Sequence, residues 1–122
     1  MRPGRPKPAP RGTLAMTTFD KREEAFEKKF VVDEELKFKA LARRDRLIGL
    51  WVAAKLGLSG EEAIAYSRET VAAEFNEGGE VAVIAKLTSD LAAKGIAVTE
   101  EEIRSQMGEF LLLAIAQVKA GM

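Results

Sequence analysis

Three phenylalanines, Phe19, Phe26 and Phe30, lie among charged residues and are the side chains best suited to chemistry in this sequence. At about 100° per residue of α-helix, their rings fall within roughly 40° of one another along one side of a helix. The chemistry that such a stripe supports is recognition, because buried aromatic side chains supply much of the binding energy of protein interfaces. Neighbouring charges would set the register and orientation of the contact more than its affinity. The predicted partner-binding residues are Phe19, Lys21, Arg22, Glu23, Phe26, Lys28, Lys29 and Phe30.

The same three rings could instead pack on the core of their own domain, since an apolar stripe usually marks the buried face of a helix. As a helix, residues 19–32 would be about 20 Å long, and an isolated helix of that length is marginal in water. The segment therefore needs a surface to bind in either interpretation.

Catalysis is a poor fit to this composition. The chain contains no cysteine and no histidine. Thiol nucleophiles, disulfides, imidazole bases and most zinc sites are thereby excluded. We predict no catalytic residue, no metal site, no cofactor and no enzymatic activity.

The charge distribution also restricts the class of partner. The first fifteen residues hold four basic and no acidic residues, so residues 16–122 contain 15 basic and 19 acidic residues, a net charge of −4. A mildly acidic body argues against a nucleic-acid groove. No apolar run reaches the ~20 residues of a bilayer span, and no signal-peptide segment follows the basic N-terminus. We therefore expect a cytoplasmic protein without direct membrane insertion.

Apolar residues recur with a helical period along most of the chain, which predicts an all-α fold. Its 122 residues, 47% of them hydrophobic, suit one small domain with a modest core. The expected helices would form a four-helix bundle with short loops, and they cover residues 33–56, 61–75, 80–94 and 100–119.

Three regions follow from this pattern. Residues 33–122 form the bundle, and residues 16–32 precede it as an N-terminal helical arm. Residues 1–15 contain all four prolines and almost no apolar surface to bury, so they are expected to be a disordered basic tail. This tail is either an extension without function or a segment that contacts an acidic partner.

Glycines and capping residues predict where the helices begin and end. Gly57 and Gly95 are suited to a left-handed helix stop. Ser59 and Thr99 are each followed three residues later by glutamate, the pattern of a capping box. The Gly78-Gly79 pair predicts a turn and not a phosphate loop, because the Gly-Lys-Ser/Thr of such a loop is missing.

Gly49 and Gly108 fall inside predicted helices, where each costs ~1 kcal/mol relative to alanine. Close approach of another helix is the simplest explanation, and a small-ligand pocket is the alternative. Arg43, Arg44 and Arg46 point in different directions around their helix, so we expect them to be solvated or in weak ion pairs.

The helical period also predicts which residues face inward. Trp51, with Leu47 and Ile48, is expected to anchor the core from the first helix of the bundle. Leu112 and Ile115 lie opposite the main apolar face of the last helix, which should therefore be wedged between several helices. The other predicted inward residues are Ile64, Val71, Phe75, Val81, Ile84, Leu87, Leu91, Ile103, Met107, Phe110, Leu111, Ala114 and Val118.

From residue 16 onward the chain resembles a known family. The phrase MTTFDKREEAFEKKF, followed by DEELKFKALARR and LIGLWVAAKLGL, is similar to the alphaproteobacterial zeta subunit, an inhibitor of the F-type ATP synthase. The resemblance is most specific in FDKREEAFE and GLWVAAKLGL, which stand in the order and spacing of the family.

The resemblance implies a function and its partners. In the zeta family the N-terminal segment inserts as a helix between a catalytic beta and a non-catalytic alpha subunit, next to the central-stalk gamma subunit. There it blocks rotation in the direction of ATP hydrolysis. By this resemblance, residues 16–32 are the inhibitory arm, and the bundle stays outside, peripheral to the membrane-bound enzyme.

Two other functions remain open. The resemblance also allows ADP or ATP binding, as in an adenine-nucleotide-sensing bundle, but no phosphate motif is present and the nucleotide-binding residues are unknown. A generic helical adaptor for another complex would keep the aromatic arm and have a different partner.

Overall fold

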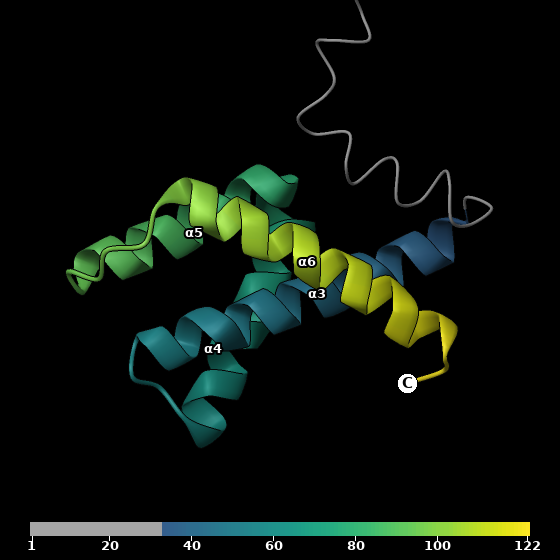
Figure 1. Cartoon of the computed structure of the whole chain (residues 1–122), viewed down its shortest axis with the longest axis horizontal. Helices are drawn as coiled ribbons and strands as arrows, with labels where there is room; N and C mark the ends of the chain where they lie inside the picture. The colour runs from purple at the N-terminus through teal and green to yellow at the C-terminus, as the bar shows by residue number, and fades with distance from the viewer. Residues whose placement is uncertain (1–32) are drawn as a thin grey trace, which may run out of the picture. The chain divides into compact units, whose positions relative to one another are not determined.

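The computed structural model describes residues 33–122, and Glu34–Met122 form one compact unit. No strand occurs in this part of the chain, so the predicted all-α fold with four main helices is confirmed. The predicted tail, residues 1–15, and the predicted arm, residues 16–32, lie outside the described residues. The elements are α3 (Glu34–Lys55), α4 (Gly60–Ala72), the π-helix η1 (Ala73–Gly78), α5 (Gly79–Ala93) and α6 (Glu100–Lys119) (Figure 1).

The longest helix, α3, packs against α4, α5 and α6. Helix α6 crosses α3 with the opposite chain direction, so that its C-terminal end lies over the N-terminal half of α3 (Figure 1). There the Arg43 guanidinium donates hydrogen bonds to Gln117 Oε1 at 3.2 Å and to the backbone oxygen of Met122. These bonds attach the C-terminus of the chain to α3.

The predicted glycine stops are confirmed. Gly57 has a φ of +84°, and the N–H of Leu58 donates to the Ala53 carbonyl at 2.9 Å. Gly95 (φ +71°) ends α5 with the same backbone pattern. In both cases the next apolar residue, Leu58 or Ile96, packs against the core, as is typical of this helix end.

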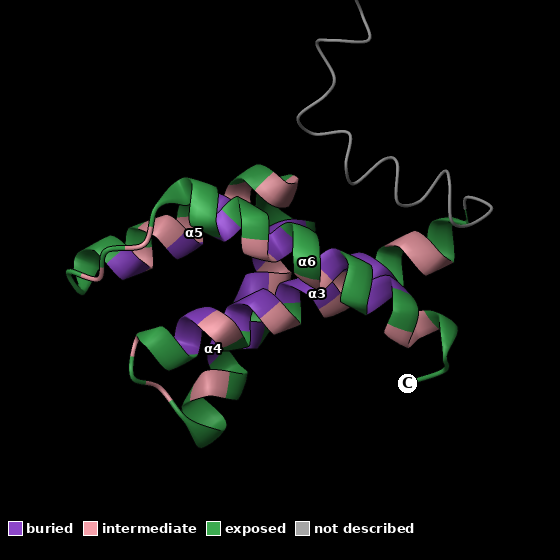
Figure 2. Cartoon of the chain, viewed as in Figure 1, coloured by how far each residue is buried: buried purple, intermediate pink, exposed green. Residues whose placement is uncertain are grey.

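The apolar core lies where α3, α5 and α6 meet, and buried residues line their facing sides (Figure 2). The core confirms most of the predicted inward residues of the last two helices. Fully or almost fully buried are Ile48, Val52, Val83, Ile84, Leu87, Leu91, Ile103, Met107, Leu111 and Ala114.

The predicted inward face of helix 61–75 is wrong. Ile64 is 41% exposed and Phe75 is 39% exposed, whereas Tyr66, Ser67 and Thr70 are buried. Helix α4 therefore turns a largely polar face toward α3, which a hydrophobic period cannot reveal.

Close packing at Gly49 explains this orientation. A Cβ atom at Gly49 would lie 2.8 Å from Ser67 Cα and 2.8 Å from Thr70 Oγ1, so α3 and α4 are in backbone contact here. The two hydroxyls remain hydrogen-bonded when buried, since Ser67 donates to the Ile64 carbonyl at 2.7 Å and Thr70 to the Tyr66 carbonyl at 2.9 Å. Close helix approach at Gly49 is thus confirmed, and the space that a pocket would need is filled.

Gly108 does not follow the same prediction. It is exposed on α6, and no heavy atom of the described chain would lie within 4 Å of a Cβ atom there. The expectation of close packing at this position is therefore wrong.

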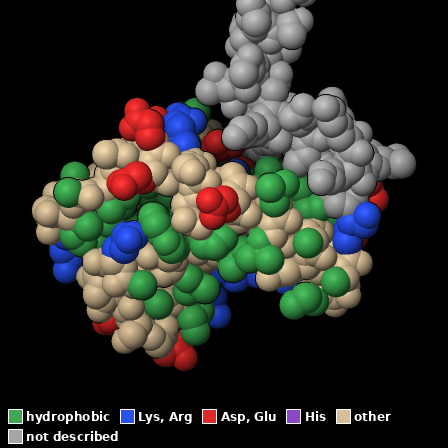
Figure 3. All heavy atoms as spheres, viewed as in Figure 1, with side chains coloured by type: hydrophobic (Ala, Val, Ile, Leu, Met, Phe, Trp, Pro, Cys, Tyr) green, Lys and Arg blue, Asp and Glu red, His purple; other side chains and the backbone are tan. Residues whose placement is uncertain are grey.

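Several predicted core positions lie at the surface because the outer sides of α5 and α6 are uncovered. Val81, in the first turn of α5, is 75% exposed. Leu112 and Leu113 are 54% and 43% exposed, so α6 is not wedged on all sides, although Ile115 is buried. Figure 3 shows hydrophobic side chains among polar ones on the viewed face of the bundle.

The predicted turn at Gly78-Gly79 is confirmed, but the helix before it is of another kind than expected. From Ala73 to Gly78 the chain continues as a π-helix, a wider coil than the α-helix. Gly79, with a φ of +71°, then redirects the chain into α5. Within residues 33–122, no helix is both long and apolar enough to cross a bilayer.

The capping box at Thr99 is confirmed, and the one at Ser59 is wrong. Thr99 Oγ1 accepts the Glu102 N–H at 3.1 Å, and Glu102 Oε1 accepts the Thr99 N–H at 2.8 Å. Ser59 makes no side-chain cap bond. Gly60 directly after it has a left-handed φ of +57°, so the chain enters α4 from a direction that a capping box does not allow.

The two interior glycines give a matched test of the fold. Gly49→Ala should lower the free energy of unfolding despite its better helix propensity, because the new methyl group would overlap Ser67 Cα and the Thr70 side chain on α4. Gly108→Ala should raise it by up to about 1 kcal/mol, since nothing opposes the gain in propensity. Urea unfolding of both variants measures the two signs, and stabilisation by Gly49→Ala would contradict the close contact.

The two N-caps give a second matched test. Thr99→Ala should destabilise the chain by about 1 kcal/mol, the usual effect of removing a side-chain cap. Ser59→Ala should change stability much less, because its hydroxyl caps nothing. Thermal unfolding compares the two variants, and equal losses would show that the Ser59 hydroxyl does contribute to the helix start.

Candidate partner-binding site

The residues predicted to bind a partner lie outside the described part of the chain. Their roles therefore stay predictions, and the described residues show only what the bundle itself contributes. The residues concerned are Phe19, Lys21, Arg22, Glu23, Phe26, Lys28, Lys29 and Phe30.

An exposed aromatic pair lies on the surface of the bundle. Phe38 of α3 is 55% exposed, and its ring centroid lies 4.5 Å from that of Phe75 in η1. Sequence reasoning assigned no role to Phe38 and placed Phe75 in the core. Phe38 lies seven residues before the buried Asp45, on the same line of α3, but near an end of the helix that neighbouring elements only partly cover.

A buried charged cluster lies between α3, η1 and α5. Arg44 Nε donates to Asp45 Oδ1 at 2.9 Å, Nη2 to Glu74 Oε1 at 3.0 Å, and Nη1 to Glu80 Oε1 at 3.4 Å. The side chain of Arg44 is 2% exposed, so the prediction that this arginine is solvated or in a weak ion pair is wrong. The sequence held one indication that Arg44 and Asp45 are buried. At helical spacing they lie on the same face of α3 as the apolar residues Ile48 and Val52.

Burial determines the electrostatics of Asp45. Removal from water raises the pKa of this carboxyl from 3.8 to about 8, against the lowering effect of the Arg44 guanidinium and with the help of Glu74. At neutral pH the Asp45 carboxyl is therefore mostly protonated. Its Oδ2 atom has no hydrogen-bond donor among the residues that the structure describes, as expected for an oxygen that carries the proton itself.

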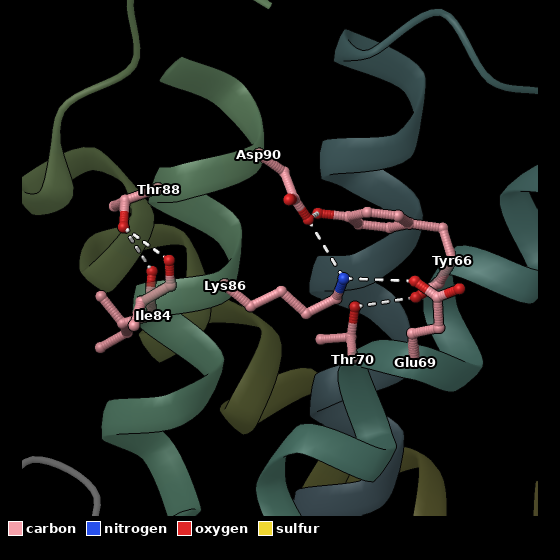
Figure 4. Close-up of polar contacts among 8 residues, drawn as sticks. Tyr66, Glu69, Thr70, Ile84, Lys86, Thr88 and Asp90 are labelled. Carbon is pink, nitrogen blue, oxygen red and sulfur yellow. Dashed lines mark hydrogen bonds and ion pairs between the residues drawn. The ribbon is translucent and has the colours of Figure 1, made fainter. Parts of the chain in front are cut away.

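A second polar group joins α4 to α5 (Figure 4). The Tyr66 hydroxyl donates to Asp90 Oδ2 at 2.7 Å, and Lys86 Nζ donates to the same oxygen at 3.1 Å and to Glu69 Oε1 at 3.2 Å. Lys86 Nζ also lies 4.4 Å from the centre of the Tyr66 ring. Burial, with Asp90 adding to the effect, raises the pKa of Tyr66 far above its usual range, so the hydroxyl stays a donor. The group stabilises packing and offers no nucleophile.

A shallow cavity of about 350 Å³ opens between the end of α3 and the start of α6. Trp51, predicted as a core anchor, packs against the core but is only partly buried, and Lys55 Nζ lies 4.4 Å from its ring centre. The carboxylate of Glu102 on the cavity wall disfavours a phosphate group. The lining residues are Trp51, Lys55, Ala97, Val98, Glu102, Ser105 and Gln106.

Comparison with known proteins gives the family. A family model described as ATPase inhibitor subunit zeta matches residues 16–117, a span that includes the predicted arm. A structure solved by solution NMR is 42% identical to this chain, with a TM-score of 0.62 over 71% of this chain and 99% of that one. No curated protein gives a significant match. The chain therefore belongs to the ATPase inhibitor subunit zeta family, whose members are regulatory subunits and not enzymes.

Proposed function

We propose that residues 16–32 are the inhibitory element of this ATPase inhibitor, and that they insert as a helix between the beta and alpha subunits of an F-type ATP synthase. In that position, next to the gamma subunit, the helix blocks rotation in the direction of ATP hydrolysis. The observation that carries the proposal is the span of the family match, which begins at residue 16 and so contains the aromatic stripe.

The physical chemistry of the stripe supports a wedge of this kind. Burial of Phe19, Phe26 and Phe30 at an interface would contribute ~1.5–3 kcal/mol each before the costs of ordering are subtracted. The mixed charges beside them fix the direction and register in which the helix binds. This mechanism requires no cofactor.

The organisation of the chain is compatible with separate roles for the arm and the bundle. Residues 34–122 form a compact unit with their own core. The bundle would then stay on the outside of the enzyme, peripheral to the membrane and on its cytoplasmic side, while the arm makes the inhibitory contact.

The double change Phe26→Ala and Phe30→Ala tests the proposal. Loss of two central aromatic anchors, worth about 2 kcal/mol or more each, should weaken inhibition of ATP hydrolysis at least tenfold. The melting temperature of the free protein should hardly change, because a partner-binding stripe adds little to the core of the free chain. The measurements are ATP hydrolysis by the synthase titrated with each protein, and thermal unfolding.

Glu24→Ala is the matched control, because Glu24 lies on the opposite side of the predicted helix. It should leave both measurements unchanged. A large loss of stability in the double variant, with inhibition retained by its folded fraction, would assign the rings to the core and overturn the wedge.

The partner itself can be identified separately. The tagged full chain should capture alpha and beta subunits from an extract of its own cells, and the Phe26→Ala, Phe30→Ala variant should capture less. Specific capture of another complex would favour the helical adaptor.

A further inference from the structure

The cluster around Arg44 holds more acid than its arginine can neutralise. Arg44 faces three carboxyl groups, from Asp45 on its own helix, Glu74 on η1 and Glu80 on α5. The side chains of Arg44, Asp45 and Glu74 are only 2%, 0% and 6% exposed. Among the described residues, α4 and α6 supply no ionisable group that acts on Asp45. With both acids ionised, the three buried side chains Arg44, Asp45 and Glu74 would carry a net charge of −1.

One oxygen shows how this charge is reduced. Asp45 Oδ1 accepts from Arg44, but Oδ2 meets no donor within residues 33–122. A buried carboxylate oxygen without a donor is costly, and such atoms are rare in folded proteins. Arg44 holds Asp45 Oδ1 with Nε at 2.9 Å and Glu74 Oε1 with the neighbouring Nη2 at 3.0 Å, so the two carboxyl groups lie side by side. A proton on Asp45 Oδ2 would then be donated to Glu74.

We propose that Asp45 carries a buried proton that it donates in a hydrogen bond to Glu74, and that this proton is a pH-sensitive latch that holds the π-helix η1 against α3. Two facing carboxyl groups that share a proton are a known arrangement in proteins, because like charges at such short distance cannot both be ionised cheaply. The proposal is independent of the inhibitory role of residues 16–32.

The position of Glu74 makes the proton a latch between two elements. The backbones of α3 and η1 come close at few points. The charged cluster and the Phe38–Phe75 ring pair both link them. Loss of the proton would set two buried carboxylates against each other, and the π-helical segment is the part of the contact with the less regular backbone. Above about pH 8, η1 should loosen and the two rings should separate.

The direction of the pH effect follows from the pKa of Asp45. The pKa of Asp45 is about 8 in the folded chain, whereas the usual value for an aspartate, taken for the unfolded chain, is 3.8. Folding therefore favours the protonated form. The stabilisation is complete below about pH 4, declines as the pH rises, and is lost once the pH exceeds about 8. For one proton, the folding equilibrium constant falls about tenfold per pH unit within that window.

Asp45→Asn in the full chain tests the latch. The amide can accept from Arg44 and donate to Glu74, as the protonated acid does, but it cannot titrate. Between pH 5 and 7, the folding constant of the natural chain should fall about a hundredfold relative to this variant, as measured by urea unfolding. An identical pH dependence in both chains would overturn the proposal.

Asp90→Asn is the matched control, since it removes a carboxylate from the Tyr66 group and leaves the Arg44 cluster intact. This variant should keep the pH dependence of the natural chain. If it instead became as flat as Asp45→Asn, the pH dependence would belong to the contact between α4 and α5, and the assignment to Asp45 would be wrong.

Two measurements on the natural chain do not depend on how well a variant folds. The side-chain carboxyl carbon of Asp45, followed by ¹³C NMR, should titrate with a midpoint near pH 8, and a midpoint near pH 4 would overturn the proposal. Between pH 6.5 and 9, the amides of η1 should lose protection against hydrogen exchange relative to those of α6. Equal protection across that range would show that the proton does not hold η1.

Discussion

The backbone contact between α3 and α4 at Gly49 is the constraint on which the rest of the bundle depends. The two helices can approach so closely because α3 has no side chain at Gly49 and α4 presents only Ser67 and Thr70. Both hydroxyls are hydrogen-bonded to carbonyls of their own helix, so the contact leaves no unsatisfied polar group. This contact fixes the rotation of α4, which turns Tyr66 toward α5 and leaves Ile64 partly exposed.

The interior of the bundle consequently has an apolar and a polar part. Between α3, α5 and α6 the packing is apolar. Along α4 and into η1, the buried positions Ser67, Thr70 and Glu74 follow one another at helical spacing and form a polar seam against α3. Arg44 and Asp45 complete the seam from the α3 side. A buried polar network of this kind gives little net stability compared with apolar packing. When all its polar groups are hydrogen-bonded, however, it allows few other ways of packing the helices.

The predicted recognition residues and the folded bundle occupy different parts of the chain of this inhibitor-family member. The recognition residues predicted from the sequence fall in residues 16–32, and residues 34–122 have a core of their own. The chain has no histidine, the usual side chain for pH responses near neutrality. The buried Asp45 carboxyl takes a pKa near 8 instead, because burial in the seam disfavours its charge. A chain without histidine can therefore still respond to pH in the physiological range.

The sequence by itself determined the helical class, the four main helices, the stops at Gly57 and Gly95 and the cap at Thr99, because these depend on local periodicity and backbone conformation. It also carried the resemblance that the family match supports. Only the tertiary structure decided which face of α4 is inside, that Arg44 and Asp45 are buried, and that the chain passes through a π-helix at Ala73–Gly78. Prediction of a buried face from the hydrophobic period assumes that the buried face of a helix is apolar. At Gly49 the close approach of two backbones selects small hydroxyl side chains, and beside Arg44 buried charges compensate one another, so the assumption fails at both places.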